Sequence, residues 1–288
     1  MHAQKYPFAV RLYGFPADET ALIGGALAHA PAPGPQFACL LEDSLQEPDL
    51  LIANADDARA LASLMAARPG PVRPALVVGA GRCALPFPQL DRPLDLRRLF
   101  AELALLLTLR GEALAGLAAH GEGGSQGEVP SGVAGPPERR RHPRPEPDLG
   151  DPADYCARRR PPPDGAVLII DIGGAFRDHL ACLVGARKLA IEWTDCVRTA
   201  VRLCEETPVS LVLVNTSAPG IDPYALCADI KALEAAARIA VVLLVGPNFR
   251  YDAARARAAG VRGLLDKPVA DRHLVATLHR LLSLPVEA

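Results

Sequence analysis

Apolar runs of the length of buried strands alternate with helical patterns in the second half of the chain. The strand-like runs are Ala166–Asp171, Leu189–Trp193, Val209–Asn215, Ile239–Val245 and Gly263–Asp266. The helical patterns are Phe176–Lys188, Asp195–Glu206, Tyr224–Ala235, Tyr251–Ala259 and Asp271–Leu284. Strands and helices that alternate in this way predict an α/β fold with a doubly wound parallel sheet.

The first half repeats this rhythm in a shorter form. Its strand-like runs are Phe8–Tyr13, Phe37–Leu41, Leu50–Ala53 and Ala75–Val78. Helical patterns lie near Asp18–His29 and Asp56–Ala67, and a further one starts at Leu94. Since the order of elements is the same, we expect two doubly wound parallel five-stranded sheets of flavodoxin-like type.

Three short segments match between the halves in the same order, which indicates a duplication. Leu50–Asn54 matches Leu211–Asn215, and Ala75–Gly79 matches Val242–Gly246. The third match joins Asp91-Arg-Pro-Leu to Asp266-Lys-Pro-Val. The first copy is shorter between the second and third matches, so it is expected to lack most of its fourth helix.

Residues 121–165 separate the halves. This stretch has 10 Pro and 8 Gly among 45 residues, so it buries too little apolar surface to offset the entropy of ordering. The predicted domains are therefore residues 1–120, a flexible linker at 121–165, and residues 166–288. The arginine clusters at 139–141 and 158–160 lie in this linker beside a similar number of acidic residues, and are interpreted as solvated charge rather than as a ligand site.

The net charge of −2 carries no electrostatic signature of nucleic-acid binding, which is therefore unlikely. The seven cysteines never form a C-x-x-C pair, which argues for reduced thiols and against a metal site. No stretch offers eighteen uninterrupted apolar residues, and the amino terminus does not resemble a signal peptide. These features favour a cytoplasmic protein without membrane association or cofactor.

The run Leu211–Val214 ends at Asn215, just before the turn at Pro219-Gly220. A side chain at the carboxyl end of a central strand lies where open α/β sheets place their sites. Together with Ala259–Val269, which contains Lys267-Pro268, this segment resembles the receiver domains of response regulators. The resemblance implies that Asn215 stands at the phosphoacceptor position and Lys267 at that of the active-site lysine.

The other receiver positions are also altered. The resemblance places Asp171 at the first position of the acidic pair and Ile172 at the second. Val245 takes the place of the switch Thr or Ser, and Leu264 that of the switch aromatic residue. Because Mg²⁺ requires several hard anionic oxygens, phosphorylation is expected to fail at both the metal and the acceptor. A contact of Lys267, Asp171 and Asn215 could lock one conformation; alternatively, Asn215 merely caps its loop.

The first copy departs further from the receiver pattern. Tyr13 and Gly14 are assigned to its acidic pair. Asn54 stands at its acceptor position, and Gly79 lies at or next to its switch position. The remaining equivalents are Arg92 and Pro93, which replace the Lys-Pro pair. The resemblance implies no phosphorylation chemistry in this copy.

The helix that starts at Leu94 is expected to reach His120, well beyond the last helix of a receiver. Its leucines fall at spacings of three and four, and the interaction candidates among them are Leu103, Leu107, Leu114 and Leu117. The extension is interpreted as a dimerisation element, or else as a helix that folds back over the first domain. Tyr251 is a further interaction candidate, since receivers often use that face.

The sequence thus predicts a non-enzymatic signalling protein that acts by phosphorylation-independent protein–protein interaction. The resemblance implies as partner a histidine kinase, a response regulator or a transcription component, and a homodimer is expected. The alternative is a sensor of a small molecule or cyclic dinucleotide that uses the altered receiver pocket. An enzyme is disfavoured because no paired acid and base groups follow the strands beyond Asp171, Asp266 and Lys267.

Overall fold

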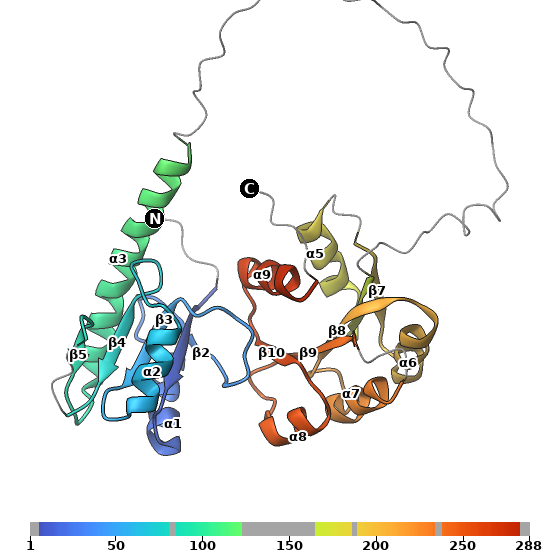
Figure 1. Ribbon diagram of the computed structural model, residues 1–288, viewed down its shortest axis with the longest axis horizontal. Helices are drawn as coiled ribbons and strands as arrows, with labels where there is room; N and C mark the ends of the chain where they lie inside the picture. Colours follow the sequence, from blue (N-terminus) through green and yellow to red (C-terminus); the bar gives the residue numbers. More distant parts are fainter. Residues whose placement is uncertain (1–5, 81–84, 123–164, 186–188, 234–237, 283–288) are drawn as a thin grey trace, which may run out of the picture.

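The computed structural model describes residues 6–80, 85–122, 165–185, 189–233 and 238–282. Two α/β domains lie side by side, the first drawn in blue to green and the second in yellow to red (Figure 1). The predicted linker lies outside the described residues except at its two ends. Among the described residues, no helix is long and apolar enough to cross a membrane.

The first domain is built on a parallel five-stranded sheet in the order β2-β1-β3-β4-β5. Its strands are β1 (Phe8–Tyr13), β2 (Phe37–Cys39), β3 (Leu50–Asn54), β4 (Ala75–Val78) and β5 (Gln89–Leu90). Its helices are α1 (Ala17–Ala28), α2 (Ala58–Ala66) and α3 (Leu96–Glu122). The two-residue strand β5 escaped the sequence pattern because it is too short to show a period.

The second domain repeats this topology in the order β7-β6-β8-β9-β10. Its strands are β6 (Ala166–Ile170), β7 (Ile191–Thr194), β8 (Val209–Asn215), β9 (Ala240–Val245) and β10 (Gly263–Asp266). Its helices are α5 (Ala175–Val184), α6 (Val197–Glu206), α7 (Pro223–Lys231), α8 (Ala253–Ala258) and α9 (Asp271–Leu282). The two sheets confirm the predicted fold class.

Each sheet buries apolar side chains on both faces, as expected for parallel strands. In the second domain one face packs against α5 and α9, and the other against α6, α7 and α8. In the first domain α1 and α3 cover one face, while α2 packs on the other. Among the described residues, no helix connects β2 to β3 or β4 to β5 in the first domain. The predicted shortening of the fourth helix is thus confirmed for the described part.

The connection between β2 and β3, residues 40–49, lies against the edge of the second sheet. Leu45 N donates to Leu264 O at 2.8 Å, and Leu264 N donates to Asp43 O at 3.2 Å. These two bonds give residue 44 a parallel bridge to β10. Leu45 also packs against the apolar cluster formed by α5 and α9. In the second domain the helix α6 connects the second and third strands. In the first domain this connection is residues 40–49, which dock on the second domain.

Candidate functional site

The predicted pocket of the second domain forms at the carboxyl ends of three strands. Asn215 is the last residue of β8, Asp171 follows β6, and Lys267 follows β10. Because β6 and β8 are neighbours in the sheet, the side chains of Asp171 and Asn215 emerge at the same edge. The geometry brings all three predicted side chains together, as parallel strands place their terminal residues at one end of a sheet.

A chain of hydrogen bonds connects these side chains. Lys267 Nζ donates to Asn215 Oδ1 at 2.6 Å, and Asn215 Nδ2 donates to Asp171 Oδ1 at 2.6 Å. Asn215 Oδ1 also accepts from Ser217 N at 2.9 Å, so the same amide caps its own loop. Asn215 therefore makes both the contact with Lys267 and Asp171 and the loop cap, with Oδ1 shared by Lys267 and Ser217 and Nδ2 given to Asp171.

The pKa of Lys267 depends on its burial and on the charge of Asp171. Burial lowers the pKa of the Lys267 ammonium below its usual value, and the negative charge of Asp171 opposes that shift. The amide of Asn215 is neutral, so it provides hydrogen bonds but no compensating charge. Asp171 is therefore the nearby anion that favours the charged form of the lysine.

The first domain builds a comparable contact from different residues. Arg92 Nη2 donates to Asn54 Oδ1 at 2.9 Å, and Asn54 Nδ2 donates to Gly14 O at 2.8 Å. Arg92 also forms ion pairs with Glu19 at 2.9 Å and with Asp56 at 3.2 Å. As in the second domain, a cation follows the last strand and contacts the asparagine that ends the third strand. The peptide bonds Arg92–Pro93 and Lys267–Pro268 are both cis.

The second domain matches the model of a known protein family. Residues 167–279 match the family model of the response regulator receiver domain. The second domain is a receiver-type module of two-component signalling. The match runs from β6 into α9, so it covers the whole pocket around Asn215. No curated protein matches the chain.

Solved receiver structures are similar to part of the chain. A putative response regulator from Chloroflexus aurantiacus is 18% identical and covers 42% of this chain and 98% of its own, with a TM-score of 0.37. The receiver domain of a Pseudomonas aeruginosa sensor histidine kinase has the same coverage and TM-score at 19% identity. A receiver domain from Saccharomyces cerevisiae, crystallised with a histidine phosphotransfer protein, is 18% identical over 41% of this chain and 88% of its own, with a TM-score of 0.37.

Receivers imply a magnesium ion beside the acceptor, but the residues present do not fit one. Asp171 is the single carboxylate of the hydrogen-bonded group, and Oδ1 of Asn215 is already used by Lys267 and Ser217. Ile172 is 57% exposed and has no oxygen to offer from its side chain. No group of three or more acidic, His or Cys side chains suited to a metal occurs within the described residues.

The switch positions contain no hydroxyl or aromatic side chain. Val245 ends β9 and packs in the core, and its carbonyl accepts the backbone N–H of Lys267 at 2.8 Å. Leu264 is fully buried in the same cluster. Pro268 follows the lysine in the cis conformation already noted.

Strand register corrects the alignment of the first domain by one residue. Tyr13 pairs with Ala53, just as Ile170 pairs with Val214, so Gly14 rather than Tyr13 is the counterpart of Asp171. The Gly14 carbonyl receives the amide of Asn54 in place of a carboxylate. A wrong register was inferred because the sequence offers no acidic residue by which to fix the end of β1.

The same register settles the position of Gly79. Asn54 pairs with Val78, whereas Asn215 pairs with Leu244. Gly79 is therefore the counterpart of Val245. A side chain at Gly79 would meet the Asp56 carboxylate at 2.9 Å, so glycine permits the close approach of the two loops. Asp56 and Glu19, which hold Arg92, were missed because no motif marks them.

The candidate interaction leucines of α3 fall into two groups. Leu103 is fully buried and Leu107 is half-buried, and both pack in the core of the first domain. The prediction that Leu103 is an interaction residue is therefore wrong, because this part of the leucine stripe packs against the sheet of its own domain. Leu114 and Leu117 are 38% and 61% exposed and lie beyond that core. The helix projects past the sheet, as Figure 1 shows, rather than folding back over it.

The interaction candidate Tyr251 contacts the first domain. Its hydroxyl donates to Asp43 Oδ2 at 2.7 Å. Burial raises the pKa of Tyr251, and the hydrogen bond and charge of Asp43 raise it further. The phenol therefore stays protonated and keeps its role as a donor. The face that receivers often offer to partners is, at this residue, in contact with the connection of residues 40–49.

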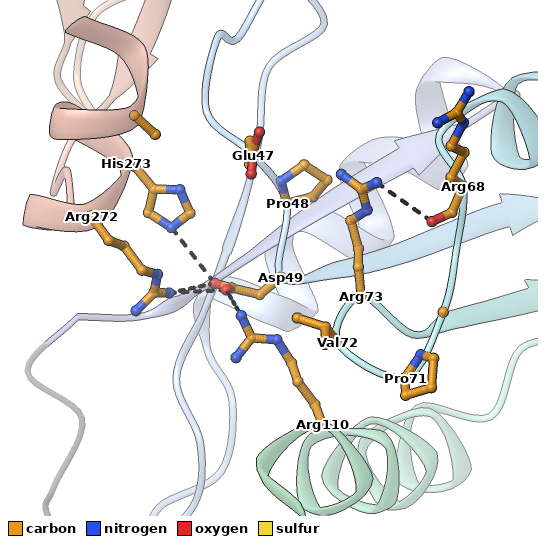
Figure 2. A pocket seen from close by; sticks show the side chains of 12 residues that line it. Glu47, Pro48, Asp49, Arg68, Pro71, Val72, Arg73, Arg110, Arg272 and His273 are labelled. Atoms are coloured by element: carbon orange, nitrogen blue, oxygen red, sulfur yellow. Dashed lines mark hydrogen bonds and ion pairs between the residues drawn. The ribbon is translucent and has the colours of Figure 1, made fainter. Parts of the chain in front are cut away.

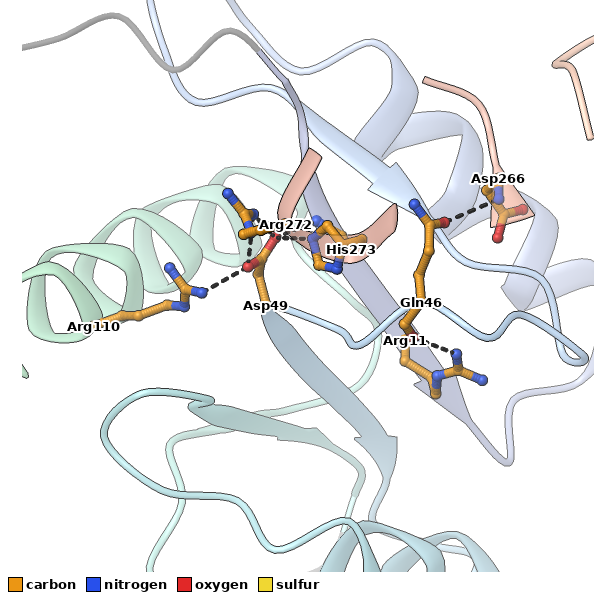
Figure 3. Close-up of polar contacts among 8 residues, drawn as sticks. Arg11, Gln46, Asp49, Arg110, Asp266, Arg272 and His273 are labelled. Atoms are coloured by element: carbon orange, nitrogen blue, oxygen red, sulfur yellow. Dashed lines mark hydrogen bonds and ion pairs between the residues drawn. The ribbon is translucent and has the colours of Figure 1, made fainter. Parts of the chain in front are cut away.

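A buried carboxylate of the first domain forms the polar centre of the interface. Asp49 is 1% exposed and accepts from Arg110 of α3 at 2.7 Å and from Arg272 of α9 at 2.9 Å. Figure 3 shows these contacts, with His273 beside them. Asp49 Oδ2 also accepts from Ala9 N at 2.9 Å. Sequence patterns could not reveal this cluster, because Asp49 and Arg272 are 223 residues apart.

A second polar contact of the interface involves the residue before Lys267. The backbone N–H of Asp266 donates to Gln46 Oε1 at 3.0 Å, a contact also drawn in Figure 3. Burial raises the pKa of the Asp266 carboxyl, while hydrogen bonds and the charge of Arg11 lower it. The docking segment thus lies directly beside the altered pocket of the receiver.

Proposed function

We propose that the chain is a cytoplasmic, non-enzymatic signalling protein of two-component type that acts by phosphorylation-independent protein contacts. The observation that carries this proposal is that the side chain of Asn215 is hydrogen-bonded to both Lys267 and Asp171. In a working receiver the lysine pairs with the phosphoryl group and the carboxylate with the metal. Here the two groups are bridged by a neutral amide, which is too poor a nucleophile to form an acyl phosphate.

Both domains support this interpretation in the same way. Arg92 binds Asn54 in the first domain as Lys267 binds Asn215 in the second. Each asparagine is 8% exposed and has its side-chain oxygen bonded to a cation. Because the side-chain oxygen of each asparagine is already bonded to a cation, a sensor of a small molecule or cyclic dinucleotide in the receiver pocket gains no support from these contacts.

Phosphorylation is tested by incubation with acetyl phosphate and Mg²⁺, followed by intact-mass measurement. The protein is expected to gain no acid-labile phosphoryl group, and beryllofluoride should not bind saturably. Asn215→Asp is expected to restore little, since Ile172 and Val245 remain. The double variant Asn215→Asp with Ile172→Asp, which adds two carboxylates beside Asp171, is the matched gain-of-function control. A phosphoryl group on the unaltered protein would contradict the proposal.

The partner proposed for the long helix is a second copy of the chain. Leu114 lies eleven residues after Leu103 and Leu117 eleven after Leu106, which is about three helical turns. The exposed pair therefore continues the stripe that Leu103 and Leu106 bury against the sheet. Two copies that pair these extensions would cover the stripe where the first domain no longer does.

Light scattering with the double variant Leu114→Glu and Leu117→Glu tests this pairing. The full chain is expected to be a dimer and the variant a monomer with an unchanged circular dichroism spectrum, because both side chains are exposed. The double variant Glu112→Gln and Arg98→Gln, on the same helix, serves as a control that should leave the mass unchanged. A monomeric unaltered protein would contradict the dimer.

Beyond the homodimer, we propose a signalling protein as partner: a histidine kinase, a response regulator or a transcription component. The receiver match of residues 167–279 supports this class. Since Tyr251 and the β10 edge contact the first domain, the surface offered to such a partner lies elsewhere on the second domain. Crosslinking from exposed positions on α6 and α7 in the native cell would test where it binds.

A further inference from the structure

A cavity of about 500 Å³ lies between the two domains, beside the buried carboxylate of Asp49. This volume falls within the usual range of small-molecule sites. Figure 2 shows the hollow between the start of α9, the carboxyl-terminal part of α3 and the turn that follows α2. Neither of the altered receiver pockets contributes to it. The basic residues that line it are Arg68, Arg73, Arg110, Arg272 and His273.

The charge of the lining is unbalanced. Four arginines and the two carboxylates of Glu47 and Asp49 line the cavity, which leaves an excess of two positive charges when His273 is neutral. Burial lowers the pKa of His273, and the charge of Arg272 lowers it further against the pull of Asp49. Arg110 and Arg272 share Asp49, whereas no carboxylate in the described part of the chain pairs with Arg68 or Arg73. A dianion would neutralise the excess.

Arg68 occupies a backbone position that favours another residue. Its φ of 52° makes it the one non-glycine residue with positive φ in the described part of the chain. It follows the end of α2, where helices usually place glycine or asparagine, and an ordinary side chain is strained there. A long cationic side chain at such a position indicates that the guanidinium has a use, since strained residues collect at functional sites.

The neighbouring arginines have donors left for a ligand. The Nε atoms of Arg73 and Arg110 are buried and have no hydrogen-bond partner within the described residues. Arg73 is oriented by its bonds to the carbonyls of Ala67 and Arg68, and Arg110 by its bond to Asp49. Guanidinium groups fixed in this way form the planar donor forks that suit phosphate oxygens.

From this geometry we propose that the interdomain cavity binds a small phosphorylated molecule carrying a dianionic phosphate group. A phosphate monoester carries close to two negative charges at neutral pH, whereas a single carboxylate would neutralise only half of the excess. Asp49 acts as a positioning residue that holds Arg110 and Arg272 at the cavity wall. Because Arg272 belongs to the second domain and the other arginines to the first, the ligand bridges the two domains.

Calorimetric titration of the full chain with pyrophosphate and with inorganic phosphate tests the proposal, with ionic strength held constant by chloride. Saturable binding of one phosphate-bearing probe per chain is expected, and acetate should bind at least tenfold more weakly. Equal heats with all anions would show an adventitious ion only and overturn the proposal. An increase in the melting temperature that grows with probe concentration is the independent readout.

Two substitutions distinguish a built site from general attraction. Arg68→Gly removes a guanidinium while it relieves the positive φ, so the fold should be retained and the affinity should fall at least threefold. Arg272→Gln should weaken binding by a similar factor from the other domain. Arg98→Gln, on an exposed part of α3, should leave the affinity unchanged. If Arg68→Gly and Arg272→Gln bind as tightly as the unaltered chain, or if Arg98→Gln weakens binding equally, the site is not in the cavity.

Discussion

The two pockets reach similar contacts with different residues. In the second domain two consecutive hydrogen bonds connect the side chains of Lys267, Asn215 and Asp171. In the first domain Arg92 and Asn54 repeat it, but the last acceptor is the backbone carbonyl of Gly14. The comparison shows that a cation bound to the terminal amide of the third strand persists although the acidic ligand does not. What both copies share is the contact between this cation and the amide that ends the third strand.

The domains also differ in what connects their second and third strands. The second domain has the helix α6 there, whereas the first has residues 40–49 without a helix. These residues supply Asp43, Leu45, Gln46 and Asp49 to the other domain. The loss of one helix thus gave the first domain a docking segment. The receiver-type second domain, with all of its helices, acts as the platform.

Asp49→Ala should have the largest effect, because it removes the charge that joins the domains. The free energy of unfolding is expected to fall by about 3 kcal/mol, since Arg110 is left without its buried counter-ion and Ala9 N loses its acceptor. Chemical denaturation followed by the fluorescence of Trp193 measures the change in the second domain. Glu112→Ala, which removes an exposed carboxylate from α3, is the control and should leave stability within about 0.5 kcal/mol.

The matched pair Arg92→Ala and Lys267→Ala compares the two pockets directly. Arg92 has an amide and two carboxylates as partners, so its loss should cost about 2 kcal/mol. Lys267 is partly desolvated and has Asn215 as its side-chain acceptor, so its loss should cost about 1 kcal/mol or less. Thermal unfolding of both variants gives the order, and a larger loss for Lys267→Ala would contradict it.

Asp266→Asn and Asp91→Asn should differ in the pH dependence of stability. The pKa of Asp266 is raised in the folded protein by burial, so the folded state binds more protons than the unfolded state above about pH 3.8. Stability from this group is therefore present at low pH and is lost as the pH rises through the raised pKa. Asp266→Asn should remove this loss, so that the melting temperature of the variant falls less as the pH rises.

Asp91, its counterpart in the first domain, is exposed and serves as the control. The melting temperature of Asp91→Asn is measured over the same pH range for comparison. A profile altered equally by both substitutions would show that docking of residues 40–49 does not set the surroundings of Asp266.

The sequence predicted the strands because buried parallel strands read as continuous apolar runs, and the structure confirms Val209–Asn215 and Gly263–Asp266 to the residue. The contact of Lys267, Asn215 and Asp171 was also foreseen, since three strand ends of one sheet must meet. The contact of Asp49 with Arg272 could not be predicted, because it depends on how the two domains pack. The role of Leu103 was misjudged because one apolar stripe serves both the core and the surface.

The docking of residues 43–45 on β10 has a consequence for solubility. An outer strand of a parallel sheet presents unpaired N–H and C=O groups, which can recruit another chain. Here Leu264 gives both of its backbone groups to the first domain. A fragment that begins at residue 166 would leave this strand bare and would be prone to aggregate, so the first domain also acts as a built-in guard against self-association of the second.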